Sequence, residues 1–151
     1  MKTLIGLMLL ICGTLVSCSR APEPISYGKD ACSHCKMTIM DNKFATEIVT
    51  AKGKIFKFDA IECMTDFIND NPEVNTPEAL FLAVNIASPG TLIDARNAFF
   101  LKDNAFRSRM GGNLAAFEVK QLAENNRQSA DWQIFTWTEL LQSHKIELAV
   151  K

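Results

Sequence analysis

Sulfur-bearing side chains are concentrated in one short stretch of the chain. Cys32 and Cys35 are three residues apart, His34 lies between them, and Met37 follows. A loop that folds over itself brings both cysteine sulfurs to one point, and soft thiolate and thioether donors select Cu(I), zinc or iron–sulfur clusters. Zinc prefers thiolate, imidazole and carboxylate ligands, whereas a neutral thioether suits Cu(I). The stretch therefore favours a Cu(I) site built from Cys32, Cys35 and Met37, with His34 as a further candidate.

Another methionine with unusual neighbours lies far away in the sequence. Met110 occurs in Ser108-Arg109-Met110-Gly111-Gly112, between charged residues and glycines rather than inside a periodic apolar stretch. Glycine allows the backbone to adopt positive φ or to approach another group closely, so this loop is suited to presenting a sulfur. A sulfur donor to the predicted soft-metal site is therefore one interpretation of Met110. The alternative is that it fills a gap at the edge of the core, a common role for methionine.

The cysteine pair has alternative interpretations that the residues leave open. A C-x-x-C pair serves as a redox centre in thioredoxin-like folds, although no strand precedes Cys32 and no strong helix pattern begins at Cys35. A structural disulfide in so short a loop adds no more than about 2 kcal/mol. A zinc site needs a second pair of ligands. Only Cys63, His34 and His144 remain, and they do not form a second C-x-x-C pair.

Cys63 lies in a predicted helix, one residue before the core-facing Met64. A buried small apolar thiol is one interpretation of Cys63, and a third ligand or a reactive thiol near the site is the other. His34 lies in a polar loop, where a histidine is usually solvated. Met40, close to the cluster, is either a substitute donor or a core residue.

No set of residues typical of an enzyme is present. The sequence has no Ser/His/Asp grouping with a nucleophile turn, no P-loop and no dinucleotide fingerprint, and its carboxylates are scattered. We therefore predict a metal-binding protein that is not an enzyme. A thiol–disulfide redox protein that uses Cys32 and Cys35 is the alternative.

The N-terminal residues have the layout of a targeting signal. A positive start is followed by an apolar run from Leu4 to Val16, which is too short to span a bilayer. Small residues then precede Cys18, as in the bacterial lipobox, where cleavage leaves an N-terminal cysteine that carries lipid. We predict a signal peptide over residues 1–17 and lipidation of Cys18, the alternative being an ordinary signal peptide. Ser19 is not the aspartate that signals inner-membrane retention, which favours the outer membrane, facing the periplasm.

Composition limits what the rest of the chain can do. Residues 18–30 contain two prolines and small polar residues, so they are predicted to form a lipidated tether. Without residues 1–17 the chain has 134 residues with 15 basic and 17 acidic side chains, a size that fits one domain over residues 31–151. The near-neutral balance argues against nucleic-acid binding, because no basic stripe is available to meet phosphates.

Hydrophobic patterning predicts an α+β domain of two β/α halves, the first ββαβ-like. Residues 44–50 and 55–58 are rich in β-branched and aromatic side chains and flank a polar link with a glycine, which indicates a hairpin. Residues 59–70 have helical spacing, with Asp59 as N-cap. Strands are predicted at 80–86 (central), 98–101 and 132–135, a loop at 108–113, and helices at 117–126 and 138–148. The predicted aromatic core comprises Phe44, Phe56, Phe58, Phe67, Phe81, Trp132, Phe135 and Trp137.

Four motifs, taken in order, resemble those of the NosL family. They are Cys32-x-x-Cys35-Lys36-Met37, the strand end Phe58-Asp59, the helical Glu62-Cys63-Met64, and Arg109-Met110-Gly111-Gly112-Asn113-Leu114-Ala115-Ala116-Phe117. The resemblance covers nearly the whole predicted mature chain and includes the lipobox. Members of this family are copper-binding lipoproteins associated with assembly of the copper centres of nitrous-oxide reductase.

The resemblance implies an α+β fold similar to that of the organomercurial lyase MerB, with one Cu(I) per chain. It implies a copper chaperone whose partner is apo-nitrous-oxide reductase or another copper acceptor. By motif, the expected ligands are Cys35, Met37 and Met110. The sequence departs from the family at Lys36, where glycine is common, and at Arg109, where proline is common. These departures bear on the geometry of the loops rather than on the identity of the donors.

Overall fold

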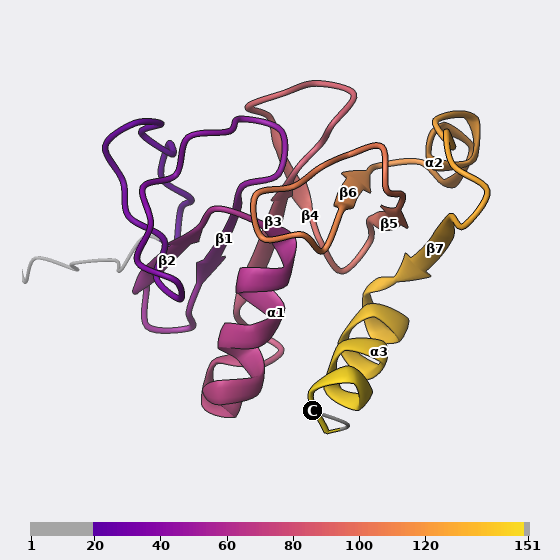
Figure 1. The fold of residues 1–151 in the computed structure, drawn as a ribbon. Coiled ribbons are helices and arrows are strands. Elements are labelled where there is room, and N and C mark those ends of the chain that lie inside the picture. The colour runs from indigo at the N-terminus through magenta and orange to yellow at the C-terminus, as the bar shows by residue number, and fades with distance from the viewer. Residues whose placement is uncertain (1–19, 150–151) are drawn as a thin grey trace, which may run out of the picture.

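Two antiparallel sheets, each with helices of its own, make up the protein (Figure 1). The structure is a computed structural model that describes residues 20–149, with side chains through residue 143. The strands are ordered β2-β1-β3-β4 in the first sheet and β6-β5-β7 in the second. This confirms the predicted α+β class. The predicted signal peptide and Cys18 lie outside the described residues.

The first sheet is built on the predicted hairpin. β1 (Thr46–Val49) pairs with β2 (Ile55–Phe58) and, on its other side, with β3 (Leu80–Val84). The inner position of β3 is confirmed, since the short β4 (Leu92–Asp94) pairs with its far edge. β4 was not predicted. Its three residues carry too little pattern to identify a strand without the neighbour with which they pair.

Helix α1 (Ile61–Asp70) packs on the first sheet. Its Phe67 ring lies 4.7 Å from the ring of Phe56 and 5.2 Å from that of Phe58, measured between centroids. The helix itself confirms the prediction, but the predicted cap is wrong. Ala60 is the N-cap residue and makes no side-chain cap, while the Asp59 carboxylate is turned toward two loops described below.

The second half contains β5 (Phe99–Lys102), β6 (Leu114–Phe117) and β7 (Gln133–Thr136). Strand β6 was missed, because the helix was expected to begin at residue 117. In the structure residues 114–117 pair with β5, and the helix is shortened to α2 (Lys120–Asn125). The short 3-10 helix η1 (Pro72–Val74) and the terminal helix α3 (Trp137–Ala149) complete the chain.

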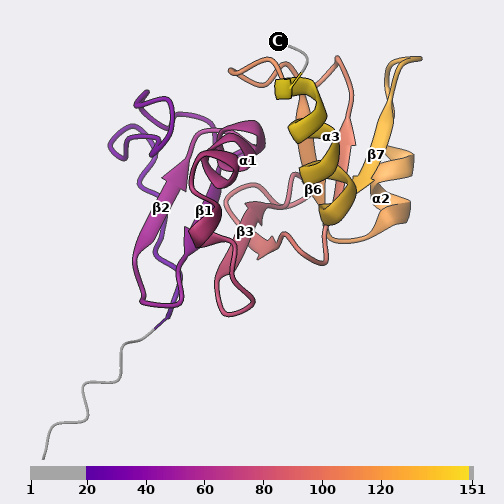
Figure 2. The same cartoon turned by 90° about the horizontal axis from the view of Figure 1, so that it is seen from below.

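The two halves are joined by α3 and by one bridge between the sheets. Figure 2 shows them side by side, with α1 on the first half and α2 and α3 on the second. The indole of Trp137 lies 5.3 Å from the ring of Phe81 in β3 and 6.0 Å from that of Phe100 in β5. Residues Asn85 and Ala116 form an isolated parallel bridge between the sheets. One continuous core therefore spans both halves.

The predicted aromatic core is confirmed except at one position. Phe44, Phe58, Phe81 and Trp137 are buried, and Phe56, Phe67 and Phe135 pack against the core. Trp132 is 37% exposed, and the Arg127 guanidinium lies 4.4 Å from the centre of its ring. Trp132 comes just before β7, the edge strand of the second sheet.

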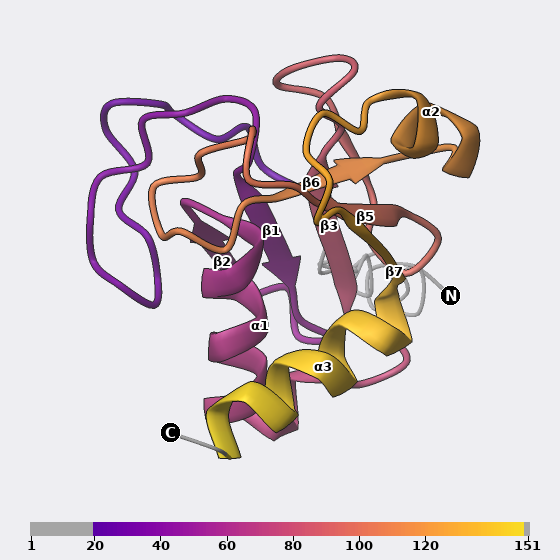
Figure 3. The same cartoon turned by 45° about the vertical axis from the view of Figure 1, so that its right-hand side comes forward.

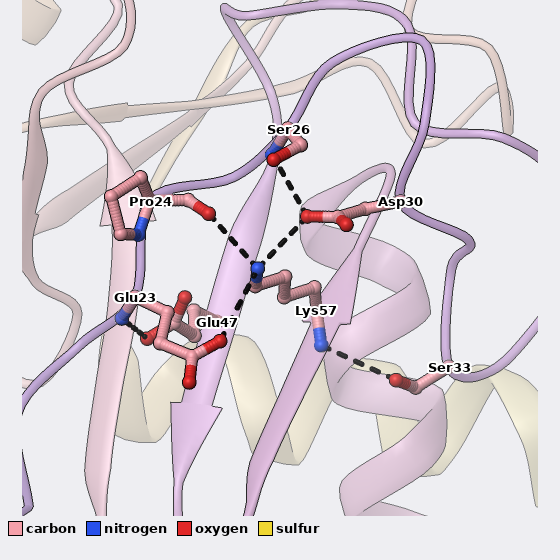
Figure 4. A network of polar contacts seen from close by, with 7 residues as sticks. All are labelled: Glu23, Pro24, Ser26, Asp30, Ser33, Glu47 and Lys57. Carbon is pink, nitrogen blue, oxygen red and sulfur yellow. Dashed lines mark hydrogen bonds and ion pairs between the residues drawn. The ribbon is translucent and has the colours of Figure 1, made fainter.

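An N-terminal segment, residues 23–30, lies against the first sheet (Figure 4). The Lys57 ammonium donates to the Pro24 carbonyl at 2.9 Å and to the Asp30 carboxylate at 2.8 Å. The backbone N–H of Glu23 donates to the buried carboxylate of Glu47 at 3.0 Å. These residues were assigned to a tether from their composition, but in the structure they are hydrogen-bonded parts of the domain.

None of the helices among the described residues is long and apolar enough to cross a bilayer.

Candidate metal centre

Three cysteine thiols converge where the loop before β1 meets the start of α1. The sulfurs of Cys32, Cys35 and Cys63 all lie within 4.8 Å of one another. Cys32 and Cys63 are fully buried, whereas Cys35 is partly exposed. All three are free thiols. A soft cation that reaches the partly exposed Cys35 therefore has two further sulfur donors behind it.

The cysteine loop is closed by its own backbone. Cys32 N–H donates to the Met37 carbonyl at 2.8 Å, and Lys36 N–H donates to the Cys32 carbonyl at 3.0 Å. Ser33 fastens the loop to β2, because its N–H donates to the Lys57 carbonyl at 2.8 Å and its hydroxyl accepts the Lys57 N–H at 3.2 Å. The local spacing of the two cysteines thus produces the convergence that the sequence predicted.

The tight loop imposes an unusual backbone conformation on Lys36. Its φ is +65°, in the left-handed region that costs L-residues roughly 1–2 kcal/mol and glycine nothing comparable. This gives a physical reason for glycine at the matching position of the family motif. The Lys36 ammonium donates to the Ser33 carbonyl at 2.5 Å, so the side chain is held against its own loop.

Hydrogen bonds make Cys32 the acidic member of the three. The Cys63 thiol donates to the Cys32 sulfur, and this bond does most to lower the pKa of Cys32, to about 4. Burial opposes the shift, and the backbone N–H groups of Asp59, Cys35 and His34 reinforce it. The same bond, with burial, raises the pKa of Cys63, and burial raises that of Cys35. One thiolate is thus stabilised between two thiols.

The imidazole of His34 is directed toward α1. Its Nε2 lies 3.7 Å from an Asp66 carboxylate oxygen, and its Nδ1 lies 3.8 Å from one of Asp70. His34 is therefore not part of the group of converging ligand atoms. Its contribution to the centre is the backbone N–H that is directed at the Cys32 sulfur.

The thioether candidates lie on the loop before β1 and on the loop between β5 and β6. Met37 and Met110 are each 38% exposed, and Met40 is 56% exposed. The loop of Met110 reaches the cysteine region through Asp59, whose carboxylate lies 3.8 Å from the Arg109 Nε and accepts the Met40 N–H at 3.4 Å. Figure 3 shows this orange loop, residues 103–113, passing beside the start of α1 and the purple loop before β1.

Cys63 is the residue that sequence reasoning weighted too lightly. Its burial agrees with the interpretation as a core thiol, but its sulfur also lies within the group of converging ligand atoms. The feature of the sequence that could have identified Cys63 as a ligand is its place in the first turn of the helix that directly follows β2. The pairing of β2 with the cysteine loop through Ser33 and Lys57 could not be read from the sequence.

Comparisons with known proteins agree with this architecture. The sequence model of the NosL family matches residues 25–144. The crystal structure of the copper chaperone NosL from Shewanella denitrificans superposes with a TM-score of 0.67 at 19% identity, covering 80% of this chain and 96% of that chain. At this identity the likeness establishes the fold. A search of curated proteins found no match. Because the family match spans most of the chain, this protein belongs to the NosL family.

Proposed function

We propose that this protein binds one Cu(I) ion and delivers it to another protein. The observation that carries the proposal is the convergence of three thiols, two buried and one partly exposed. Thiolate and thioether sulfur select soft cations. With metal–sulfur bonds of about 2.3 Å, three sulfurs arranged around one ion lie about 4.0 Å apart. This spacing is within the 4.8 Å that bounds the separations of the three thiols.

Cys32, Cys35 and Cys63 form the inner donor set in this proposal, and Met37 and Met110 form the outer set. The two methionines and Cys35 are accessible from solvent, while Cys32 and Cys63 are not. An acceptor that supplies its own ligands can replace the outer donors first. Such stepwise ligand exchange suits delivery better than storage, and the Shewanella protein of the same fold is described as a copper chaperone.

The acceptor that we propose is apo-nitrous-oxide reductase, on the strength of the motif resemblance. In this proposal the lipid on Cys18 holds the protein at the cell envelope, at the outer membrane facing the periplasm, and the residues between Cys18 and the N-terminal segment connect the anchor to the domain. The protein is a metal-delivery protein and not an enzyme.

The test is an anaerobic Cu(I) titration of the reduced protein, followed by X-ray absorption at the copper edge. We expect one Cu(I) per chain with an all-sulfur first shell. Met37→Leu and Met110→Leu should each weaken binding at least about tenfold, which is about 1.4 kcal/mol. Met40→Leu is the matched control for a nearby exposed thioether. Absence of Cu(I) uptake, or a shell of nitrogen and oxygen alone, would refute the proposal.

A thiol–disulfide redox protein is the second candidate, and the low pKa of Cys32 favours it specifically. A thiolate is the nucleophile in disulfide exchange. The partly exposed Cys35 would attack a substrate disulfide, and the buried thiolate of Cys32 would resolve the mixed disulfide, leaving two substrate thiols and one disulfide in this protein. A reversible two-electron couple in a protein whose reduced form takes up no copper would favour this function over copper delivery.

A further inference from the structure

Glu62 holds the Met110 loop against the start of α1. Its carboxylate Oε1 accepts the Ser108 hydroxyl at 2.7 Å and the Gly112 N–H at 2.9 Å, and the side chain is 6% exposed. These two donors lie on either side of Met110 in the sequence. Glu62 itself is adjacent to Cys63, so one carboxylate links the thiol centre to the loop.

Gly112 is required for this contact. A Cβ at residue 112 would lie 2.6–2.9 Å from the carboxyl atoms of Glu62, closer than real Cβ atoms approach other heavy atoms. The neighbouring Gly111 has a φ of +79° and so turns the loop. The two glycines beside Met110 thus have separate tasks. Gly111 allows the turn, and Gly112 lets the backbone approach the carboxylate.

A second carboxylate anchors the loop on its other side. The Asp59 Oδ2 lies 3.8 Å from the Arg109 Nε, and the side chain of Asp59 is fully buried. The backbone N–H of Asp59 is directed at the Cys32 sulfur. Residues 109 and 112 are therefore both tied to groups that contact or adjoin the cysteines, and Met110 lies between the two ties.

We propose that Glu62 is a positioning residue that holds the thioether of Met110 in place for the ion bound by the thiols. This inference rests on the proposed function, because it takes Met110 as an outer copper ligand. Glu62 acts through the loop, by accepting the Ser108 hydroxyl and the Gly112 N–H, and does not ligate the ion itself.

The experiment compares Glu62→Ala and Glu62→Gln with the wild type for Cu(I) affinity and for the number of sulfur ligands at the copper edge. Glu62→Ala should weaken binding about tenfold, as Met110→Leu does, and remove one sulfur from the shell. Glu62→Gln keeps an oxygen at the Oε1 position and should retain the sulfur count. Glu73→Ala, at an exposed acidic residue just after α1, is the matched control for loss of charge.

The combination of Glu62→Ala with Met110→Leu isolates the indirect role. If Glu62 acts only by positioning Met110, Glu62→Ala should cause no further loss of affinity in the Met110→Leu background. Full additivity of the two effects would overturn the proposal, because Glu62 would then act by another route. Gly112→Ala is a second variant that displaces the carboxylate without removing it, and it should reproduce the loss of one sulfur.

Hydrogen exchange of the copper-free protein gives an independent readout. Glu62→Ala should speed exchange across residues 108–113 while leaving β1 and β3 protected. Suppose that the wild type binds copper. Unchanged exchange of this loop in Glu62→Ala would then overturn the positioning role alone, and so would an unchanged Cu(I) affinity and sulfur count. Failure of the wild type to bind Cu(I) would overturn the proposed function and this role together.

Discussion

Individual residues at the thiol centre depend on one another through hydrogen bonds. Cys32 accepts a bond from the Cys63 thiol and from three backbone N–H groups, and these bonds lower its pKa. Burial by itself would have the opposite effect, because a buried thiolate is poorly solvated. The low pKa of Cys32 is therefore a property of the assembled site and not of the C-x-x-C sequence.

Replacing Cys63 by alanine should raise the pKa of Cys32 from about 4 toward that of an ordinary cysteine, because the largest contribution to its stabilisation is lost. The ultraviolet absorbance of the thiolate, followed against pH, measures the change. Cys35→Ala is the control, since it leaves the bond between Cys63 and Cys32 in place. The same titration midpoint in Cys63→Ala and wild type would show that the thiol does not donate to Cys32.

Asp103 supports the second half in a similar way. Its carboxylate accepts the backbone N–H groups of Ala105, Gln128 and Ser129 at 2.7–3.0 Å. Burial opposes ionisation, but these bonds outweigh it and lower the pKa of Asp103 to about 2. Because the folded-state pKa lies below the ordinary value of 3.8, ionised Asp103 stabilises the fold above that value. This contribution disappears as the pH falls through the range from about 4 to about 2.

Asp103→Asn should destabilise the protein by about 1–3 kcal/mol at neutral pH, because one amide NH₂ must face backbone donors. The difference from wild type should shrink below pH 4. Chemical denaturation at several pH values measures both effects. A difference that stays constant down to pH 2 would contradict the proposed source of the stabilisation.

At the scale of elements, the N-terminal segment is attached to the first sheet through Lys57 of β2 and Glu47 of β1. The Lys57 side chain contacts Pro24 and Asp30, and its backbone contacts Ser33 in the cysteine loop. The bond to Lys57 also lowers the pKa of Asp30, so this carboxylate remains charged and paired at neutral pH. Lys57 thus connects the N-terminal segment to the strand that fastens the cysteine loop.

Lys57→Met should loosen residues 23–30 while preserving β2, because methionine retains the apolar stem and the backbone bonds to Ser33 but loses the ammonium. We expect faster hydrogen exchange in residues 23–30 and nearly unchanged exchange in β1 and β2. Lys54→Met is the control, because Lys54 directly precedes β2 and its ammonium lies over the Phe56 ring instead. Full protection of residues 23–30 in Lys57→Met would mean that other contacts hold the segment.

For the molecule as a whole, Trp137 is a large aromatic side chain that contacts both halves. Its indole is 8% exposed and packs between Phe81 of the first sheet and Phe100 of the second. Trp137→Ala should therefore destabilise the fold by about 3–5 kcal/mol, the range for removal of a large aromatic side chain from a core.

Thermal unfolding measured by circular dichroism, with copper uptake of the folded fraction as a second probe, tests this prediction. Trp137→Ala should lower the midpoint of one cooperative transition. Trp132→Ala, at the exposed tryptophan, is the matched control and should change the midpoint little. Two separate transitions in Trp137→Ala would instead show that the halves fold independently.

Sequence reasoning found the elements whose signals are local. The hairpin and α1 were predicted because the β-branched and aromatic content of residues 44–50 and 55–58, the polar link between them and the helical spacing of residues 59–70 are visible in a short window. β4 and β6 were not predicted, because strands of three or four residues are defined by pairing with β3 and β5, which are distant in the sequence. Asp59 was expected to cap α1, but long-range contacts with Met40 and Arg109 engage its carboxylate instead.

The amino-acid sequence by itself determined the kinds of donor and part of their arrangement. Cys32, Cys35 and Met37 are close neighbours in the chain, so a single tight loop is enough to gather them. Only the tertiary structure decided that Cys63 joins them, that His34 faces α1, and that Glu62 ties down the loop of Met110. The reason is that a hydrogen bond or a shared ligand site forms between atoms close in space, and chain separations of about 30–50 residues are closed only when the sheets and α1 pack together.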